Sequence, residues 1–189
     1  MILYLHGFRS SPQSFKARLL SAYFKQAGRE HEFVCPALPA SPAGAICMAR
    51  EIVDQYPDQT WSLIGSSLGG FYATYLAEEL ACKAVLLNPA VKPPRDLATY
   101  VGITTAYHSD EVFEFKHEYI DELHALVVDR ITMPERYFLL AATGDEVLDW
   151  REMTAHYAGA KQLVIQGSDH GISEFADYLQ TVLDFCDAS

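Results

Sequence analysis

The segment Trp61–Gly70 constrains the fold more than any other part of the chain, because it places a serine in a sharp turn between a strand and a helix. The apolar run Trp61–Ile64 predicts the strand, and the helix follows from Gly70 to Leu80. Between them, Gly65-Ser66-Ser67-Leu68-Gly69 has the pattern G-x-S-x-G. Glycines two positions before and after Ser67 let strand and helix pack closely, which lifts the serine hydroxyl clear of the backbone. Ser67 is therefore a candidate nucleophile.

Length and composition predict a single folded domain over residues 1–189. Half of the residues are hydrophobic and 12% are aromatic, which is enough for a packed core. The formal net charge of −11 argues against a nucleic-acid partner, because phosphate binding needs a concentrated basic surface. It also disfavours docking on anionic membranes. We therefore expect the partner to be a small molecule.

The start of the chain and its cysteines indicate a cytoplasmic protein. Met1 leads directly into the strand-like run Ile2–Leu5, which leaves no room for a signal peptide. No apolar run approaches the ~20 residues that a membrane-spanning helix needs. The four cysteines are scattered, without metal-ligand spacing, and predict reduced, mostly buried thiols.

Short apolar runs alternate with longer helical patterns along the chain. The predicted strands are Ile2–Leu5, Glu32–Cys35, Trp61–Ile64, Ala84–Leu87, Tyr137–Ala141 and Gln162–Ile165. The predicted helices are Pro12–Gly28, Pro42–Tyr56, Gly70–Leu80, Asp149–Tyr157 and Ser173–Cys186. This alternation is typical of an α/β fold with a doubly wound, mostly parallel six-stranded sheet and helices on both faces. Such sheets bind ligands at the carboxyl ends of their strands.

One connection, from Asn88 to Arg136, is far longer than a usual crossover. We expect a helical stretch at Arg95–Val101 and a patterned stretch at Asp110–Val128. The connection is unusually aromatic, with Tyr100, Tyr107, Phe113, Phe115 and Tyr119. We therefore expect residues 89–136 to be a small lid-like insertion before the fifth strand, which lies over the site and shapes an apolar pocket. The alternative is an ordinary crossover helix with a surface excursion.

An acid and a histidine follow Ser67 in the order that a serine nucleophile requires. A serine hydroxyl needs a base, and the base needs an orienting acid. Asp145 follows the fifth predicted strand and His170 follows the sixth, so both belong to the sheet edge of Ser67.

Other carboxylates and histidines compete for these two roles. Glu146 and Asp149 are alternative acids, although Asp149 fits the N-cap of the following helix. Asp169 adjoins His170, but sequence neighbours rarely present their side chains to each other. The remaining candidates, expected at the surface, are His108, His117, His124 and His156.

The loop after the first strand completes the candidate site. A tetrahedral intermediate needs two N–H donors, and the backbone of Leu68 and of Phe8 would supply them. Gly7 permits the close approach of the Phe8 backbone. Arg9 is either a contact for a substrate carboxylate or phosphate, or a solvated charge.

Four segments together resemble the YqiA family of small bacterial α/β-hydrolase esterases. They are Tyr4-Leu5-His6-Gly7-Phe8, Gly65-Ser66-Ser67-Leu68-Gly69-Gly70, Asn88-Pro89-Ala90-Val91 and Thr143-Gly144-Asp145-Glu146-Val147-Leu148-Asp149. The resemblance spans nearly the whole chain and implies an α/β-hydrolase fold with carboxylesterase activity, and acyl-CoA thioester hydrolysis is also attributed to the family. It assigns Ser67 as nucleophile, Asp145 as acid and His170 as base. The chain departs from the family at Arg9, where asparagine is common, and at Gly171-Ile172, where a small residue and phenylalanine are common.

The sequence thus predicts a serine carboxylesterase that hydrolyses small acyl esters through an acyl-enzyme, with no metal or cofactor. An acyl-CoA thioesterase with the same three residues is the alternative. A non-catalytic binding protein on a hydrolase scaffold is the third hypothesis, from a different class.

Overall fold

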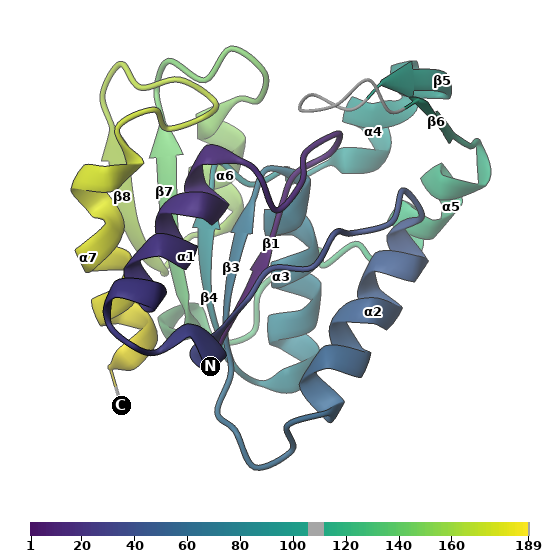
Figure 1. Ribbon diagram of the computed structural model, residues 1–189. Coiled ribbons are helices and arrows are strands. Elements are labelled where there is room, and N and C mark those ends of the chain that lie inside the picture. Colours follow the sequence, from purple (N-terminus) through teal and green to yellow (C-terminus); the bar gives the residue numbers. More distant parts are fainter. Residues whose placement is uncertain (106–111, 189) are drawn as a thin grey trace.

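The computed structural model describes residues 1–105 and 112–188, and its centre is a parallel sheet (Figure 1). The six strands lie in the order β2-β1-β3-β4-β7-β8. They are β1 (Ile2–Leu5), β2 (Phe33–Val34), β3 (Ser62–Ser66), β4 (Lys83–Leu87), β7 (Tyr137–Ala142) and β8 (Lys161–Ile165). All neighbouring pairs are parallel. The doubly wound six-stranded sheet predicted from the sequence is confirmed.

Five helices follow the strands and cover both faces of this sheet. They are α1 (Phe15–Gln26), α2 (Pro42–Asp54), α3 (Leu68–Leu80), α6 (Trp150–His156) and α7 (Phe175–Asp187). Each overlaps its predicted range and differs from it by at most three residues at either end. Alternate strand residues point to opposite faces, so Tyr4 packs with α1 and α7 while Leu5 packs with α2 and α3. Burial on both sides explains why the central strands β1, β3, β4 and β7 are largely apolar.

The strand order reverses at β1, which lies between β2 and β3. Ligands of such sheets bind beyond the carboxyl ends of the strands at this kind of reversal. The loops that follow β1, β3, β4, β7 and β8 all leave from that edge, which is the upper edge in Figure 1. The loops that contain the candidate residues predicted from the sequence therefore all lie at this edge.

The long connection between β4 and β7 contains two short helices and a separate two-stranded sheet. They are α4 (Pro93–Leu97), β5 (Gly102–Thr105), β6 (Val112–Phe115) and α5 (Glu118–Ala125), with β5 and β6 antiparallel. The helix predicted at Arg95–Val101 was partly wrong, because α4 ends at Leu97 and a 3₁₀ turn, Ala98–Tyr100, follows. The patterned stretch Asp110–Val128 holds a strand as well as a helix. Tyr107 and His108 lie outside the described residues.

The connection is held against α2 through one carboxylate. The Ser41 hydroxyl and the Ala43 backbone N–H both donate to Glu122 Oε2, at 2.7 and 2.9 Å. Glu122 belongs to α5, so these bonds fix α5 at the start of α2.

Several properties of the described residues bear on partners. None of their helices has both the length and the hydropathy needed to cross a bilayer. In the same part of the chain, no three His, Cys, Asp or Glu side chains gather so that they could hold a metal ion. The four cysteines are free thiols. Mostly buried thiols were expected, but Cys47 is exposed and the other three are half-buried.

Candidate active site

Ser67 lies in the strained turn that joins β3 to α3. Its backbone has φ 55° and ψ −121°, a conformation that non-glycine residues rarely adopt. The flanking glycines are required by contact. A Cβ atom at Gly65 would collide with the backbone of Gly69, and one at Gly69 would collide with the carbonyl of Leu5. The turn can therefore form only with the glycines that the sequence provides.

Ser67, His170 and Asp145 form one hydrogen-bonded chain. His170 Nε2 lies 3.0 Å from Ser67 Oγ, and His170 Nδ1 lies 2.7 Å from Asp145 Oδ2. Because a carboxylate only accepts hydrogen bonds, Nδ1–H donates to Asp145 and Nε2 accepts from the Ser67 hydroxyl. The structure thus brings together the three side chains singled out from the sequence, although 103 positions separate Ser67 from His170.

The Asp145 carboxylate is fully buried and held from two sides. Its side chain has 0% exposure, whereas that of His170 keeps 20%. Asp145 Oδ1 accepts the backbone N–H groups of Val147 and Leu148, each at 2.8 Å. Since Oδ1 is occupied in this way, Oδ2 is directed at the imidazole.

The competing acids have other partners. Glu146 Oε2 accepts the backbone N–H of His170 at 3.0 Å, so it supports the histidine loop and not the imidazole. Asp149 caps α6 by accepting the Arg151 N–H at 2.9 Å, as predicted. Asp169 accepts both the N–H and the hydroxyl of Ser173.

The competing histidines lie away from this chain of bonds. His117 and His124 are exposed and His156 is half-buried. Burial lowers the pKa of His156. His108 falls outside the described residues.

Asn88 holds the backbone of the histidine loop, a role that the sequence analysis missed. Asn88 is completely buried at the end of β4. Its amide nitrogen donates to the carbonyl oxygens of Asp169 and His170, both at 3.0 Å, and its oxygen accepts the Ala142 N–H at 2.7 Å. Asn88 was named from the sequence only as the start of the long connection and as part of a family motif, and no role was predicted for its side chain.

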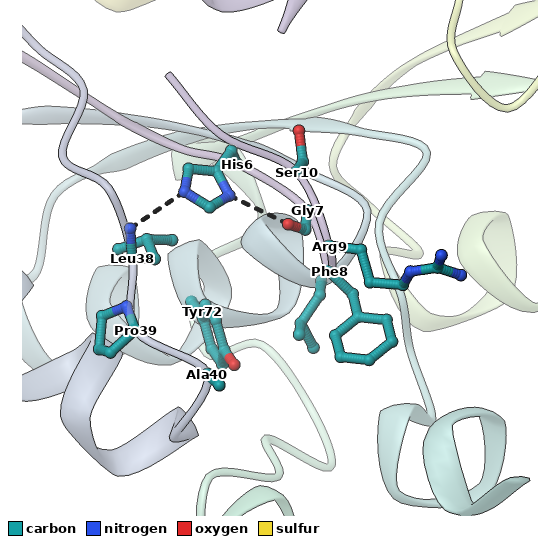
Figure 2. Close-up of a pocket in the computed structure, with 10 residues that line it drawn as sticks. His6, Gly7, Phe8, Arg9, Ser10, Leu38, Pro39, Ala40 and Tyr72 are labelled. Atoms are coloured by element: carbon teal, nitrogen blue, oxygen red, sulfur yellow. Dashed lines mark hydrogen bonds between the residues drawn. The ribbon is translucent and has the colours of Figure 1, made fainter. Parts of the chain in front are cut away.

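The loop after β1 passes directly beside Ser67. A Cβ atom placed on Gly7 would lie 3.1 Å from Ser67 Cβ. His6 orders this loop, because its Nε2 accepts the Leu38 N–H and its Nδ1–H donates to the Gly7 carbonyl, each at 3.0 Å (Figure 2). The Phe8 ring packs edge-on against Tyr100 and Phe115, with centroid distances of 5.5 and 5.0 Å. The backbone of Phe8 is thus set between the serine turn and the connection.

Two cavities flank this loop. The larger, of about 930 Å³, contains Ser67 and His170 in its wall and extends to Pro93, Leu97 and Tyr100 of the connection. The smaller, of about 210 Å³, lies between the loop and Leu38–Ala40, above Tyr72 (Figure 2). Arg9 lines the smaller cavity. Lys16, which the sequence analysis did not single out, lines the larger one.

Several solved structures have the same fold at low sequence identity. Alpha/beta hydrolase domain-containing protein 10 from mouse is 17% identical, with a TM-score of 0.71 over 97% of this chain and 89% of that one. A monoacylglycerol lipase from Paleococcus ferrophilus is 16% identical, with a TM-score of 0.65 over 96% and 91%. An esterase from Pyrococcus furiosus is 17% identical, with a TM-score of 0.66 over 97% and 78%. The fold is therefore that of the α/β hydrolases.

A family model matches almost the whole chain. The match covers residues 1–187, and the model is described as "Uncharacterised protein family (UPF0227)". It includes the serine turn, both loops that carry Asp145 and His170, and the connection between β4 and β7. The chain therefore belongs to UPF0227, the YqiA family, as its resemblance indicated.

Proposed function

We propose that this protein is a serine carboxylesterase that hydrolyses small acyl esters. The observation that carries the proposal is the hydrogen-bonded chain Ser67–His170–Asp145 in the wall of a cavity of about 930 Å³. In this arrangement Ser67 would be the nucleophile, His170 the base and Asp145 the orienting acid. Two structural neighbours are an esterase and a monoacylglycerol lipase, which agrees with this chemistry.

In the first half of the reaction, Ser67 Oγ attacks the ester carbonyl carbon and its proton passes to His170 Nε2. Asp145 stabilises the resulting imidazolium and keeps its orientation. The tetrahedral intermediate then collapses. The bond to the alcohol breaks, the alcohol oxygen takes the proton from Nε2, and the acyl group remains on Ser67.

In the second half, His170 removes a proton from water, and the hydroxide attacks the acyl-enzyme. Collapse of the second intermediate releases the carboxylic acid, and Ser67 recovers its proton from His170. Both intermediates carry an oxyanion. We propose that it accepts hydrogen bonds from the backbone N–H groups of Leu68 and Phe8. Leu68 is the first residue of α3, so its N–H is not used within the helix. Each such donor contributes a factor of about 10²–10³ in rate.

We further propose that residues 89–136 act as a cover that shapes the acyl pocket. Pro93, Leu97 and Tyr100 contribute apolar surface to the cavity of Ser67. A series of p-nitrophenyl esters from acetate to palmitate tests the cover. Rates that rise with chain length would identify an open acyl channel, whereas activity confined to acetate and butyrate would identify a closed pocket.

Covalent labelling tests the proposed nucleophile. A fluorophosphonate should modify Ser67 in the folded protein, and mass spectrometry should place the adduct on that residue. Ser67→Ala should lose both the label and ester hydrolysis, whereas Ser66→Ala keeps the Ser67 hydroxyl and should still be labelled. Full esterase activity in Ser67→Ala would exclude the proposed mechanism.

Matched oxygen and thiol esters of the same acyl group separate the esterase from an acyl-CoA thioesterase. A carboxylesterase should hydrolyse both through Ser67. Hydrolysis of the acyl-CoA alone would instead identify a thioesterase. A folded protein with neither activity and no label would be a binding protein.

A further inference from the structure

Lys16 is a buried cation in the wall of the cavity that contains Ser67 and His170. It lies in the first turn of α1 and is only 8% exposed. Its Nζ donates to the carbonyl oxygen of Gly171, at 2.5 Å. Since Gly171 directly follows His170, the ammonium group lies beside the loop that carries the proposed base.

The hydrogen bond to Gly171 uses only one of the three N–H donors of the ammonium group. Within the described residues, Gly171 is its hydrogen-bond acceptor, and no carboxylate there forms an ion pair with it. Asp169 and Asp145 act on Lys16 only through longer-range electrostatic attraction. A buried charge without a direct counter-charge is unfavourable. Within the described residues, Lys16 therefore has no negatively charged group in direct contact with its ammonium group.

The other charged groups around this cavity have partners of their own. Glu146 accepts the backbone N–H of His170, and Asp96 accepts from Arg95 at 2.7 Å. His170 is hydrogen-bonded to Asp145 and Ser67. The cavity thus contains one positive charge that is not matched by a neighbouring side chain within the described residues.

Part of the wall of this cavity is polar, in contrast to the apolar surface of Pro93 and Leu97. Ser10, Ser14, Ser173 and Tyr4 line the same cavity. The Ser14 hydroxyl oxygen is buried near that of Tyr4, and within the described residues nothing satisfies it with good hydrogen-bond geometry. A ligand oxygen that reaches Lys16 in this cavity would meet a cation.

We propose that Lys16 binds a carboxylate group that the ester substrate carries within a few atoms of the scissile bond. The inference rests on the proposed esterase function and assigns its substrate class. One ammonium group matches a monoanion, which favours a carboxylate over a doubly charged phosphate. Burial lowers the pKa of Lys16 to about 8, so the group still carries its proton at neutral pH. The apolar part of the substrate would lie against Pro93 and Leu97.

Two matched pairs of esters test this assignment in the wild-type protein. In the first, 4-nitrophenyl hydrogen succinate is compared with 4-nitrophenyl methyl succinate, which places the charge on the acyl side. In the second, 3-(butanoyloxy)benzoate is compared with its methyl ester, which places the charge on the leaving group. We expect kcat/KM to be at least tenfold higher for the anionic ester in one pair. The net charge of −11 repels anions, so this preference has to come from a local site.

Substitutions then assign the preference to Lys16. Lys16→Met should lower the anionic-to-neutral ratio of kcat/KM at least tenfold, and Lys16→Arg should retain most of it. Lys25→Met removes a charge from the exposed end of the same helix and should leave the ratio unchanged. If Lys16→Met fails to fold, the wild-type ratio and the Lys16→Arg ratio decide the question.

Two results would overturn the assignment while leaving the esterase function intact. One is a wild-type protein that hydrolyses the neutral ester as well as or better than the anionic ester in both pairs. The other is a Lys16→Met variant that loses activity equally on both esters, which would mean that Lys16 only holds the Gly171 carbonyl. Undiminished hydrolysis of any of these esters by Ser67→Ala would instead overturn the esterase function.

Discussion

Asn88 donates its side-chain amide to the carbonyl oxygen of His170 at 3.0 Å, although 82 positions separate the two residues. The same amide holds the Asp169 carbonyl, and its oxygen accepts the Ala142 N–H. Asn88 therefore joins the ends of β4 and β7 to the loop that presents the imidazole. Its own backbone is left-handed, with φ 43°, a conformation that asparagine adopts more readily than most residues.

Replacing Asn88 by aspartate tests this positioning role. Asn88→Asp keeps the size and the backbone preference but cannot donate to two carbonyl oxygens. We expect kcat to fall at least tenfold and the free energy of unfolding to fall by about 3 kcal/mol, as for other buried unsatisfied polar groups. Urea unfolding and kinetics at a temperature where the variant is folded measure the two effects.

Gln162→Glu is the matched control for Asn88→Asp. Gln162 also donates its amide to two backbone carbonyls, of Thr154 and Tyr157, but it lies on the exposed part of β8. This variant should keep kcat. Equal losses of kcat in both variants would contradict a specific role for Asn88.

The Asp145→Asn substitution separates the two neighbouring acids. An asparagine at this position does not hold the His170 tautomer in which Nε2 accepts from Ser67, so kcat should fall by roughly 10⁴-fold. Glu146→Gln keeps an oxygen that accepts the His170 N–H, and we expect a loss of less than about tenfold, within the range of a single hydrogen bond. Steady-state kinetics on one p-nitrophenyl ester measure both. A larger loss in Glu146→Gln than in Asp145→Asn would exchange the two roles.

The pKa of Lys16 predicts a pH dependence of substrate preference. Burial lowers this pKa from its ordinary value to about 8, and the protonated form predominates below that pH. The anionic-to-neutral ratio of kcat/KM should therefore be constant near neutral pH, where the substrate carboxyl is ionised, and decrease as pH rises through 8. Taking the ratio cancels ionisations that affect both esters. In Lys16→Arg the ratio should stay constant in this range, because arginine remains charged. If the ratio depended on pH in the same way in the wild-type protein and in Lys16→Arg, titration of Lys16 would not be its cause.

Gly69→Ala should prevent the serine turn from forming. Its Cβ would collide with the Leu5 carbonyl and lie 2.7 Å from the carbonyl oxygen of His6, and both are backbone atoms of a buried strand end. We expect a loss of about 3 kcal/mol or more of unfolding free energy. Gly28→Ala is the control, because Gly28 has φ 69° with nothing near its Cβ position, and the left-handed backbone alone costs about 1 kcal/mol. Urea unfolding of both variants distinguishes collision from backbone strain.

The sheet and the three hydrogen-bonded residues could be predicted because their signals are local. Continuous apolar runs between helical patterns mark the strands, and Ser67, Asp145 and His170 each follow such a run. The turn at Ser67 is specified by its own glycines. Topology then brings these strand ends together without further information.

The roles of Lys16 and Asn88 could not be predicted in the same way. A lysine at the start of a helix has the pattern of a solvated charge, and Lys16 is buried because a loop 155 positions later packs over it. Asn88 acts through backbone atoms of segments that are distant in sequence. Within the connection, the β5–β6 pair was missed because its short strands pair mainly with each other and carry no continuous apolar run.

The edge-on packing of Phe8 against Tyr100 and Phe115 couples two parts of the protein that the sequence separates. Phe8 supplies one proposed oxyanion donor from its backbone, while Tyr100 lines the cavity that we propose receives the substrate. We expect a substrate group that displaces Tyr100 to shift the Phe8 ring as well, and with it the Phe8 peptide. Poorly fitting substrates would then be discriminated through slower turnover, and not only through weaker affinity.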